Sequence, residues 1–280
     1  MKRKIFALFL AVILVVSLTG CKNFLNQQAQ EEKEELPKEI IGIETQESMK
    51  GVTLKIGVSP DFAPFTYMNS SGQMKGFDID YIEALSIYLG FDYDLVVEQM
   101  KDIEKDVASG KLDCGIAGIS MTNKRVEQFL FTDTYFENSM TLVVAKGVTA
   151  ESRKDILHMK LGAERGTSSA EYVKDNLKKF NNKIKYYDNL SAVFKALEKG
   201  KVDAAVLDST SYDYYMEKHP DSTIVSVETN LYTTQSNYAI MCNKDFAYED
   251  EFNVGMKQID LDGIYQEIYN KWFSNGKSEE

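Results

Sequence analysis

The sequence predicts an α/β protein with two lobes, and three observations lead to this prediction. Apolar stretches alternate with amphipathic stretches from Thr53 to Phe273, a pattern typical of strands separated by helices in mainly parallel sheets. This pattern covers roughly 220 residues, which is long for a single sheet. Two segments, SGKLDCGIAG from Ser109 and KGKVDAAVLD from Lys199, both place Gly-Lys, an apolar residue and an aspartate just before an apolar run. This short internal repeat favours one such helix-to-strand connection in each lobe.

The elements of the first half follow from periodicity and from helix stop signals. Gly90 and Gly110 fit the ends of two helices, and Asp113 fits the turn into the next strand. In chain order the expected elements are the strand TLKIGV, the helix DIDYIEALSIYLG, the strand FDYDLVVE, the helix MKDIEKDVASGK, the buried strand CGIAGI, a short helix from Asn123 and the strand TLVVAKG.

The second half repeats the alternation. Gly200 and Asp203 stand where Gly110 and Asp113 stand in the first half. The expected elements are KLGAERG, a helix from Ser168, KIKYYD, a helix around Leu190 to Glu198, VDAAVLD, a helix from Ser209, the strands STIVSVE and NYAIMCNK, and two closing helices that include IYQEIYNKWF.

The N-terminal stretch MKRKIFALFLAVILVVSLTGC reads as a processing signal. Basic residues precede an apolar run from Ile5 to Leu18 that is too short for a comfortable membrane span. The stretch resembles the bacterial lipoprotein signal, which implies a signal peptide over 1–20 and a lipid such as palmitate on Cys21. An ordinary secretory signal is the alternative. The polar residues that follow predict a flexible tether, so that 21–51 holds the lipidated cysteine and this tether.

Composition excludes some partners. The 280 residues include 32 basic and 43 acidic ones, for a net charge of −11, which argues against nucleic acid and against anionic lipid as binding surfaces. Beyond Cys21 only Cys114 and Cys242 remain, each in an apolar segment. Two buried thiols are the favoured interpretation, and one disulfide between them stays open.

The segment GISMTNKR, which runs from Gly118 to Arg125, concentrates hydroxyls and a guanidinium. A catalytic serine would need a base, and neither His158 nor His219 lies in a suitable context. The segment also lacks the glycine spacing of a phosphate loop. Two interpretations are left with equal weight: Thr122 caps a short helix beside a solvated Arg125, or the segment binds an anion.

Other acidic groups have simpler explanations. Asp78 and Asp80 in GFDID are expected to cap the helix that they begin and to favour its dipole, rather than to act as catalytic carboxylates. No Cys/His cluster or calcium loop appears in the sequence, so neither a metal nor another cofactor is expected.

Five segments in order carry a resemblance to a known family: LKIGVSPDFAPFTY, GFDIDYIEAL, LDCGIAGISMTNKRVEQFLFTDTYF, LGAERGTSSAEY and KVDAAVLDS. Together they resemble the extracytoplasmic solute-binding proteins of polar amino-acid ABC transporters, bacterial family 3, in lipoprotein form. The resemblance covers about Thr53 to Phe273, and GFDID together with S-x-T-x-x-R is its specific part.

The resemblance implies a type II periplasmic-binding-protein-like fold with a hinge of two crossover strands. Lobe 1 would comprise 52–143 and 236–275, lobe 2 would comprise 144–235, and the crossovers would lie near 142–147 and 231–237. It implies a monomeric importer component rather than an enzyme. The protein would be extracytoplasmic and anchored to the cell membrane through Cys21, and it would present an amino acid to ABC permease subunits.

The resemblance also implies which residues bind the ligand. The carboxylate-binding arginine falls on Arg125, with Ser120 and the backbone of Gly118 beside it. Across the cleft, Ser168 would donate a backbone N–H group and Asp208 would hold the ammonium group, so both contacts form only when the lobes close.

The family's side-chain pocket is matched less completely. Phe62 falls where an aromatic ring covers the substrate, and Met100 falls on a second wall position that is often aromatic. Ser59 replaces an aspartate found in several relatives. Glu164 would point into the pocket and favour a cationic or amide side chain, although it could equally pair with Arg165 or face water.

Two alternative functions remain at this point. A periplasmic-binding-fold enzyme, such as a prephenate- or arogenate-type dehydratase, would use Glu164 as its acid-base residue. A ligand sensor would have to act in trans, because no apolar span follows the second lobe.

Overall fold

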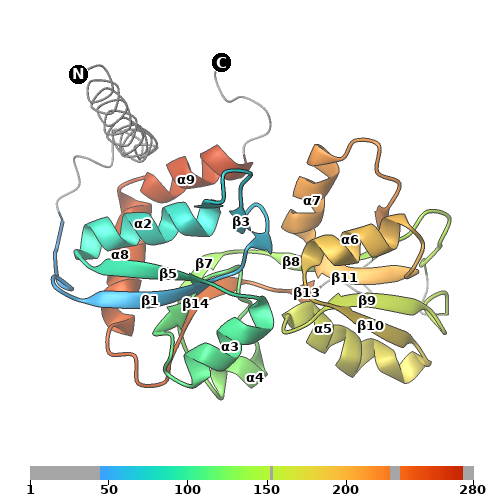
Figure 1. Cartoon of the computed structure of the whole chain (residues 1–280), viewed down its shortest axis with the longest axis horizontal. Coiled ribbons are helices and arrows are strands. Elements are labelled where there is room, and N and C mark those ends of the chain that lie inside the picture. The colour runs from blue at the N-terminus through green and yellow to red at the C-terminus, as the bar shows by residue number, and fades with distance from the viewer. Residues whose placement is uncertain (1–44, 152–153, 228–233, 274–280) are drawn as a thin grey trace, which may run out of the picture. The chain divides into compact units, whose positions relative to one another are not determined.

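The computed structural model describes residues 45–151, 154–227 and 234–273 (Figure 1). The predicted signal peptide over 1–20, Cys21 and the tether up to residue 44 lie outside the described residues. Every described element belongs to a compact unit formed by residues 43–280. No helix in the described ranges is long and apolar enough to cross a membrane.

One group of elements, called lobe 1 below, is built on a five-stranded sheet in the order β5-β1-β6-β14-β7. β1 pairs in parallel with β5 and β6, whereas β14 runs antiparallel to β6 and β7. The bounds of these strands are β1 Thr53–Val58, β5 Asp92–Val97, β6 Cys114–Gly115, β14 Tyr238–Cys242 and β7 Leu130–Phe136.

Helices cover the sheet of lobe 1 (Figure 1), and α2 is buried on most of its circumference. α8 (Glu249–Leu261) and α9 (Ile264–Phe273) pack on α2 (Phe77–Leu89), while α3 (Met100–Ala108) packs on β1 and β6. The short helix α4 (Asn123–Val126) precedes β7. Gly90 ends α2 in the left-handed conformation at φ 79°, which confirms its predicted role.

A small sheet of β2 (Asp61–Phe62), β3 (Thr66–Met68) and β4 (Met74–Lys75) connects β1 to α2. Rings from this connection join rings from β7, β14 and α9. Phe65 lies 4.9 Å from both Phe136 and Tyr238 and 5.6 Å from Phe273, measured between ring centroids. Lobe 1 therefore contains an aromatic core that both ends of the folded chain supply.

Lobe 2 is built on a sheet in the order β10-β9-β11-β8-β12, with β13 also paired to β8. β10, β9 and β11 are parallel, whereas β8 runs antiparallel to β11, β12 and β13. The strands are β8 Ser139–Val144, β9 Lys160–Glu164, β10 Lys183–Tyr187, β11 Ala204–Asp208, β12 Val225–Val227 and β13 Thr234–Gln235. The helices are α5 Ser168–Tyr172, α6 Leu190–Glu198 and α7 Ser209–Lys218, with the turns η2 Val173–Leu177 and η3 Lys178–Phe180 after α5.

The α/β fold class is confirmed, although both sheets are mixed rather than mainly parallel. The chain changes sheet between Phe136, the end of β7, and Ser139, the start of β8. This change falls before the expected crossover at 142–147, because residues 140–144 pair with β11 in the second sheet. The return lies between Gln235 and Tyr238, within the expected range of 231–237.

Two local expectations were wrong. The predicted strand CGIAGI is only two residues long, because Gly118 at φ +56° turns the chain out of the sheet. The strand β7, in which two apolar residues at each end flank Thr132, Asp133 and Thr134, was not predicted. Cys114 and Cys242 are buried free thiols on directly opposed positions of β6 and β14.

Candidate functional site

The site is built around the segment Gly118–Arg125, where lobe 1 meets lobe 2. Gly118 takes a left-handed backbone, and a Cβ atom there would lie 2.2 Å from Cε1 of Phe62. Only glycine fits this approach. The Gly118 N–H donates a hydrogen bond of 2.8 Å to Oδ2 of the buried Asp78. The backbone of Gly118 was expected beside Arg125, and its N–H group is hydrogen-bonded within lobe 1.

The pair Asp78 and Asp80 does not cap its helix, contrary to the prediction. Gly76 is the N-cap residue of α2, and both acids lie inside the first turn. Burial raises the pKa of Asp78 to about 7. Asp80 accepts a hydrogen bond of 2.6 Å from the Trp272 indole and pairs with Lys271 at 3.0 Å. These carboxylates therefore join α2 to the site segment and to the C-terminal helix.

Thr122 caps the short helix α4. Its Oγ1 accepts a hydrogen bond of 3.3 Å from the Arg125 backbone N–H, which is the usual geometry of an N-cap threonine. The capping interpretation of GISMTNKR is therefore confirmed. The accompanying expectation that Arg125 is solvated is wrong, because Arg125 is only 3% exposed.

The Arg125 guanidinium is buried and incompletely paired. Nη1 donates to the Ser120 carbonyl and Nη2 to the Gly166 carbonyl, both at 2.9 Å. The Glu104 carboxylate lies 3.8 Å from Nη2, and within the described part of the chain the Nε–H has no hydrogen-bond partner. Burial lowers the pKa of Arg125. A desolvated cation with an orphan donor favours an anionic ligand.

Hydroxyls bridge the two lobes beside this guanidinium. The Ser120 Oγ lies 2.9 Å from the Ser168 Oγ and 2.6 Å from the Ser236 Oγ. Ser168 begins α5, whose N-cap Thr167 accepts a hydrogen bond from the Ala170 N–H. The structure thus brings the expected residues Ser120, Ser168 and Arg125 together.

Asp208 ends β11 and is buried among polar groups. Its Oδ1 accepts a hydrogen bond of 2.6 Å from Asn138 and one of 3.4 Å from Ser236. Burial raises the pKa of Asp208 to about 6, and the polar neighbours Tyr238, Ser236 and Asn138 together with the Arg125 charge oppose this rise.

Glu164 ends β9 and is 5% exposed. Burial raises its pKa to about 8, and the negative charges of Asp61 and Asp208 add to the effect. Among the described residues, the neighbouring Arg165 does not pair with it: its Nε lies 3.4 Å from Asp188, and its guanidinium lies 5.6 Å from the Tyr186 ring centroid. Glu164 is therefore a buried acid, and the charges that raise its pKa, those of Asp61 and Asp208, are also negative.

The remaining expected residues are buried on lobe 1. The Phe62 ring stacks on Phe65 at 5.5 Å and meets Tyr238 edge-on at 6.2 Å. Ser59 is buried just after β1. Met100 belongs to the apolar core cluster between α3 and the sheet, so it has a packing role in the structure.

The expectations from sequence missed three residues near the site: Asn138, Ser236 and Asp61. Asn138 and Ser236 lie in the two connections between the sheets and hold Asp208 from there. Asp61 hydrogen-bonds to Ser191 of lobe 2. The only signal in the sequence for Asn138 and Ser236 was a polar residue next to a crossover strand. Because the first crossover was expected at 142–147, Asn138 was not recognised as lying next to it.

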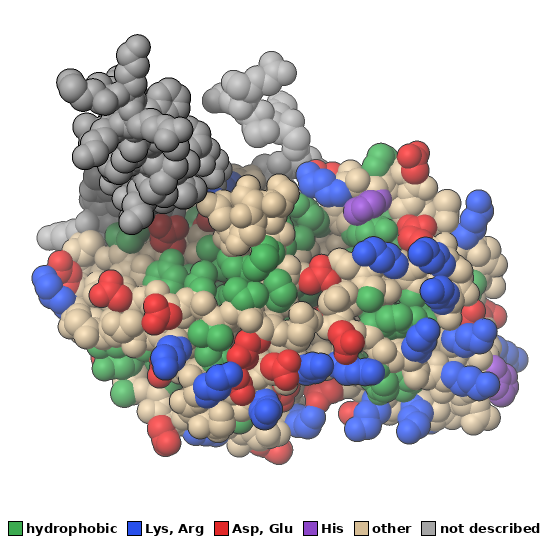
Figure 2. Space-filling model, viewed as in Figure 1, with side chains coloured by type: hydrophobic (Ala, Val, Ile, Leu, Met, Phe, Trp, Pro, Cys, Tyr) green, Lys and Arg blue, Asp and Glu red, His purple; other side chains and the backbone are tan. Residues whose placement is uncertain are grey.

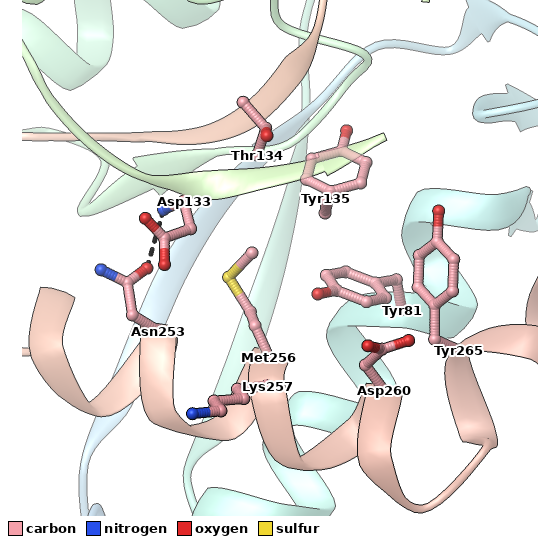
Figure 3. A pocket seen from close by; sticks show the side chains of 9 residues that line it. All are labelled: Tyr81, Asp133, Thr134, Tyr135, Asn253, Met256, Lys257, Asp260 and Tyr265. Carbon is pink, nitrogen blue, oxygen red and sulfur yellow. Dashed lines mark hydrogen bonds between the residues drawn. The ribbon is translucent and has the colours of Figure 1, made fainter. Parts of the chain in front are cut away.

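A pocket of about 360 Å³ lies elsewhere, between α2, β7, α8 and α9 (Figure 3). Tyr81, Tyr135 and Tyr265 contribute rings to its lining, and the Asp133 N–H donates a 2.8 Å hydrogen bond to Asn253 at one side. None of the expected ligand-binding residues lines it. Within the described ranges, no group of three or more His, Cys, Asp or Glu residues could hold a metal ion.

Known proteins are similar to this chain over most of its length. Residues 54–184 and 168–275 match the model of the bacterial extracellular solute-binding proteins, family 3. The chain therefore belongs to this family.

Individual relatives bind different amino acids according to their names. The chain is 28% identical over 226 residues to a probable histidine-binding protein of Neisseria gonorrhoeae, covering 80% of this chain and 84% of the relative. It is 25% identical over 289 residues to the ABC transporter glutamine-binding protein GlnH of Bacillus subtilis (strain 168), covering 99% and 100%. An ancestral arginine-binding protein solved with arginine has a TM-score of 0.73 at 33% identity, covering 79% of this chain and 98% of that one.

Proposed function

We propose that the protein captures an amino acid between its two lobes and delivers it to the permease of an ABC importer, without chemical turnover. The observation that carries this proposal is the buried Arg125 guanidinium, whose Nε–H lacks a partner among the described residues. Burying a cation is costly unless an anion matches it, and the Glu104 carboxylate at 3.8 Å from Nη2 offsets the effect of burial only in part. A ligand carboxylate at this position would reduce the remaining cost.

The rest of the site suits the other end of a zwitterion. Ser120 and Ser168 bring hydroxyls from the two lobes to the same place as Arg125. Asp208 of lobe 2 carries a carboxylate held by Asn138 and Ser236, and it would accept the ammonium group. Opposite charges from opposite lobes would bind the ligand fully only in the closed arrangement.

We further propose that the ligand's side chain is cationic. Glu164 is buried, and the charges of Asp61 and Asp208 raise its pKa in addition to burial. A cationic side chain would stabilise the ionised carboxylate and so oppose both effects, and Glu164 would then release its proton on binding. The names of relatives support this class: histidine in one and arginine in another, whereas the glutamine-binding relative represents the amide alternative.

Location outside the cytoplasm is supported by the family, which is described as extracellular. The lipid anchor on Cys21 is part of the proposal and rests on the lipoprotein-like signal. Lys and Arg side chains gather among Asp and Glu on the exposed surface of lobe 2 (Figure 2), and charged side chains of this kind on both lobes would face the permease.

One observation favours the dehydratase alternative. A pKa of about 8 keeps Glu164 protonated at neutral pH, and a protonated carboxyl in a closed site can act as a general acid. Release of phenylpyruvate from prephenate, or of phenylalanine from arogenate, would identify this activity directly.

A thermal-shift screen of the full chain against the twenty amino acids and cystine tests the binding proposal. A ligand at about 100 times its Kd stabilises the folded state by roughly 2.7 kcal/mol. We expect the largest rise in Tm for arginine, lysine or histidine. If no amino acid raises the Tm, the proposed function is wrong, and if only glutamine does, the cationic assignment is wrong.

A further inference from the structure

Asp61 makes a two-point contact between the lobes that lies outside the expected ligand contacts. Its Oδ2 accepts a hydrogen bond of 3.0 Å from the Ser191 backbone N–H, and its Oδ1 accepts one of 2.5 Å from the Ser191 hydroxyl. Asp61 begins β2 in lobe 1, whereas Ser191 lies in the first turn of α6 in lobe 2. The contact therefore joins segments 130 residues apart.

The N-terminus of α6 has an unmet requirement that Asp61 fulfils. The first N–H groups of a helix have no partner inside the helix, and their partial positive charge favours an anion. Asn189 caps the helix by accepting a 2.9 Å hydrogen bond from the Ala192 N–H, but this cap is neutral. The first turn of α6 contains no acidic residue. Asp188 precedes the N-cap, but its side chain is 69% exposed. The carboxylate that accepts the Ser191 N–H hydrogen bond at this helix end thus comes from the other lobe.

Asp61 is held rigidly with respect to lobe 1. The next residue, Phe62, packs on Phe65 and Tyr238 of the aromatic core, and the Phe62 ring fits only because Gly118 lacks a side chain. The carboxylate cannot follow α6 if the lobes separate. A hydrogen bond is lost when its atoms move apart by about 1 Å or more, so both contacts form only in the closed arrangement.

The two acids near the ligand position differ in their surroundings. Both oxygens of Asp61 already accept hydrogen bonds from Ser191. Glu164, in contrast, is 5% exposed, and the negative charges of Asp61 and Asp208 add to the rise of its pKa. This difference separates a carboxylate that joins the lobes from one that is available to a ligand.

We propose that Asp61 is a positioning residue that stabilises the closed, ligand-bound state by binding the N-terminus of α6. The proposal rests on the proposed function, because closure matters only if a ligand is enclosed. In the open state, water solvates Asp61 and the α6 terminus separately. Loss of the contact therefore accelerates ligand release and leaves the rate of ligand entry unchanged.

The test is a double-mutant cycle on the full chain with Asp61→Asn, Ser191→Ala and the two combined. Stopped-flow fluorescence and calorimetry would use the amino acid that gives the largest shift in the thermal screen. We expect Asp61→Asn to raise Kd about 10-fold or more, almost entirely through koff, because two charge-assisted hydrogen bonds are weakened. Ser191→Ala, which keeps the backbone donor, is expected to have a smaller effect. The double variant should lose less than the product of the single effects.

Asp188→Asn is the matched control. Asp188 lies three residues before Ser191 and also faces lobe 1, at 3.8 Å from the Lys101 ammonium, but its side chain is 69% exposed. Exposed ion pairs contribute little, so its Kd should change less than about 3-fold. Melting of the ligand-free variants shows whether each one is folded.

Three results would overturn the proposal. Asp61→Asn could leave Kd within about 2-fold of the wild type, it could change kon rather than koff, or its effect could be independent of Ser191. The second result would show that Asp61 acts on ligand entry, and the third would show that its effect does not pass through the Ser191 hydroxyl. If the wild type binds no amino acid, the proposed function fails and this inference fails with it, whereas wild-type binding with an unaffected Asp61→Asn variant refutes only the inference.

Discussion

Replacing Arg125 by alanine removes the guanidinium on which the proposed function depends. The side chain is 3% exposed, and its Nε–H has no partner among the described residues. A carboxylate that took this donor and one Nη donor would form two charge-assisted hydrogen bonds, each contributing roughly 1.5–3 kcal/mol. The loss of about 3–6 kcal/mol corresponds to an increase in Kd of between about two and four orders of magnitude.

The ligand-free protein should tolerate the same change. Arg125→Ala removes two hydrogen bonds of 2.9 Å to the Ser120 and Gly166 carbonyls, each contributing roughly 1.5–3 kcal/mol because the donor is charged. It also removes a buried charge whose desolvation opposes folding. The free energy of unfolding in urea should therefore fall by about 2 kcal/mol or less.

Two further variants sharpen the Arg125 test. Arg125→Lys keeps a cation but loses the planar fork, so its affinity should lie between those of the wild type and Arg125→Ala. Lys124→Ala removes the neighbouring cation, whose side chain is 61% exposed and pairs with Glu171, and it should change Kd only slightly. Titration calorimetry with the amino acid selected by the thermal screen measures all three. A folded Arg125→Ala protein that binds within about 3-fold of the wild type would refute the carboxylate assignment.

The remaining predictions concern Glu164 and Gly118. The pKa of Glu164 is raised from 4.5 to about 8 in the folded protein. Between these pH values Glu164 is ionised in the unfolded chain but keeps its proton in the folded chain. Glu164 therefore makes the ligand-free protein less stable as the pH rises from about 4.5 to 8. In urea melts at several pH values, Glu164→Gln should remove this loss of a few kcal/mol in stability, and equal pH slopes for the variant and the wild type would contradict this. The same variant should bind a cationic amino acid at least about 10-fold more weakly, and an unchanged affinity would contradict the proposed role in binding. Gly118→Ala should destabilise the fold by about 2–4 kcal/mol, because it combines a left-handed backbone with a Cβ atom 2.2 Å from Phe62. A melting temperature equal to that of the wild type would show that Phe62 moves freely.

Features that depend on neighbouring residues were predictable from the sequence. α2 ends at Gly90 because glycine adopts the left-handed conformation there at little cost. Thr122 caps α4 because its hydroxyl reaches an amide three residues later. Asp78 and Asp80 show the limit of local reasoning: their spacing fits a cap, yet Asp78 accepts its hydrogen bond from Gly118, forty residues away.

The residues of the candidate site were predictable only in part. Arg125, Ser120, Ser168 and Asp208 were assigned through a family resemblance, and the structure brings them together at the junction of the lobes. Asn138 and Ser236 were missed, because their contacts with Asp208 depend on where the chain passes between sheets. A shift of a few residues in that crossover changes which side chains line the junction.

The sequence by itself determined the α/β class, the order of most elements and the chemistry available between Gly118 and Arg125. Hydrophobic periodicity, capping residues and glycine stops act within a few residues and can be read directly. The tertiary structure alone decided that β14 enters the sheet of lobe 1 between β6 and β7, and that Asp61 meets α6. Such pairings depend on the packing of surfaces far apart in the chain, and local sequence patterns do not encode this packing.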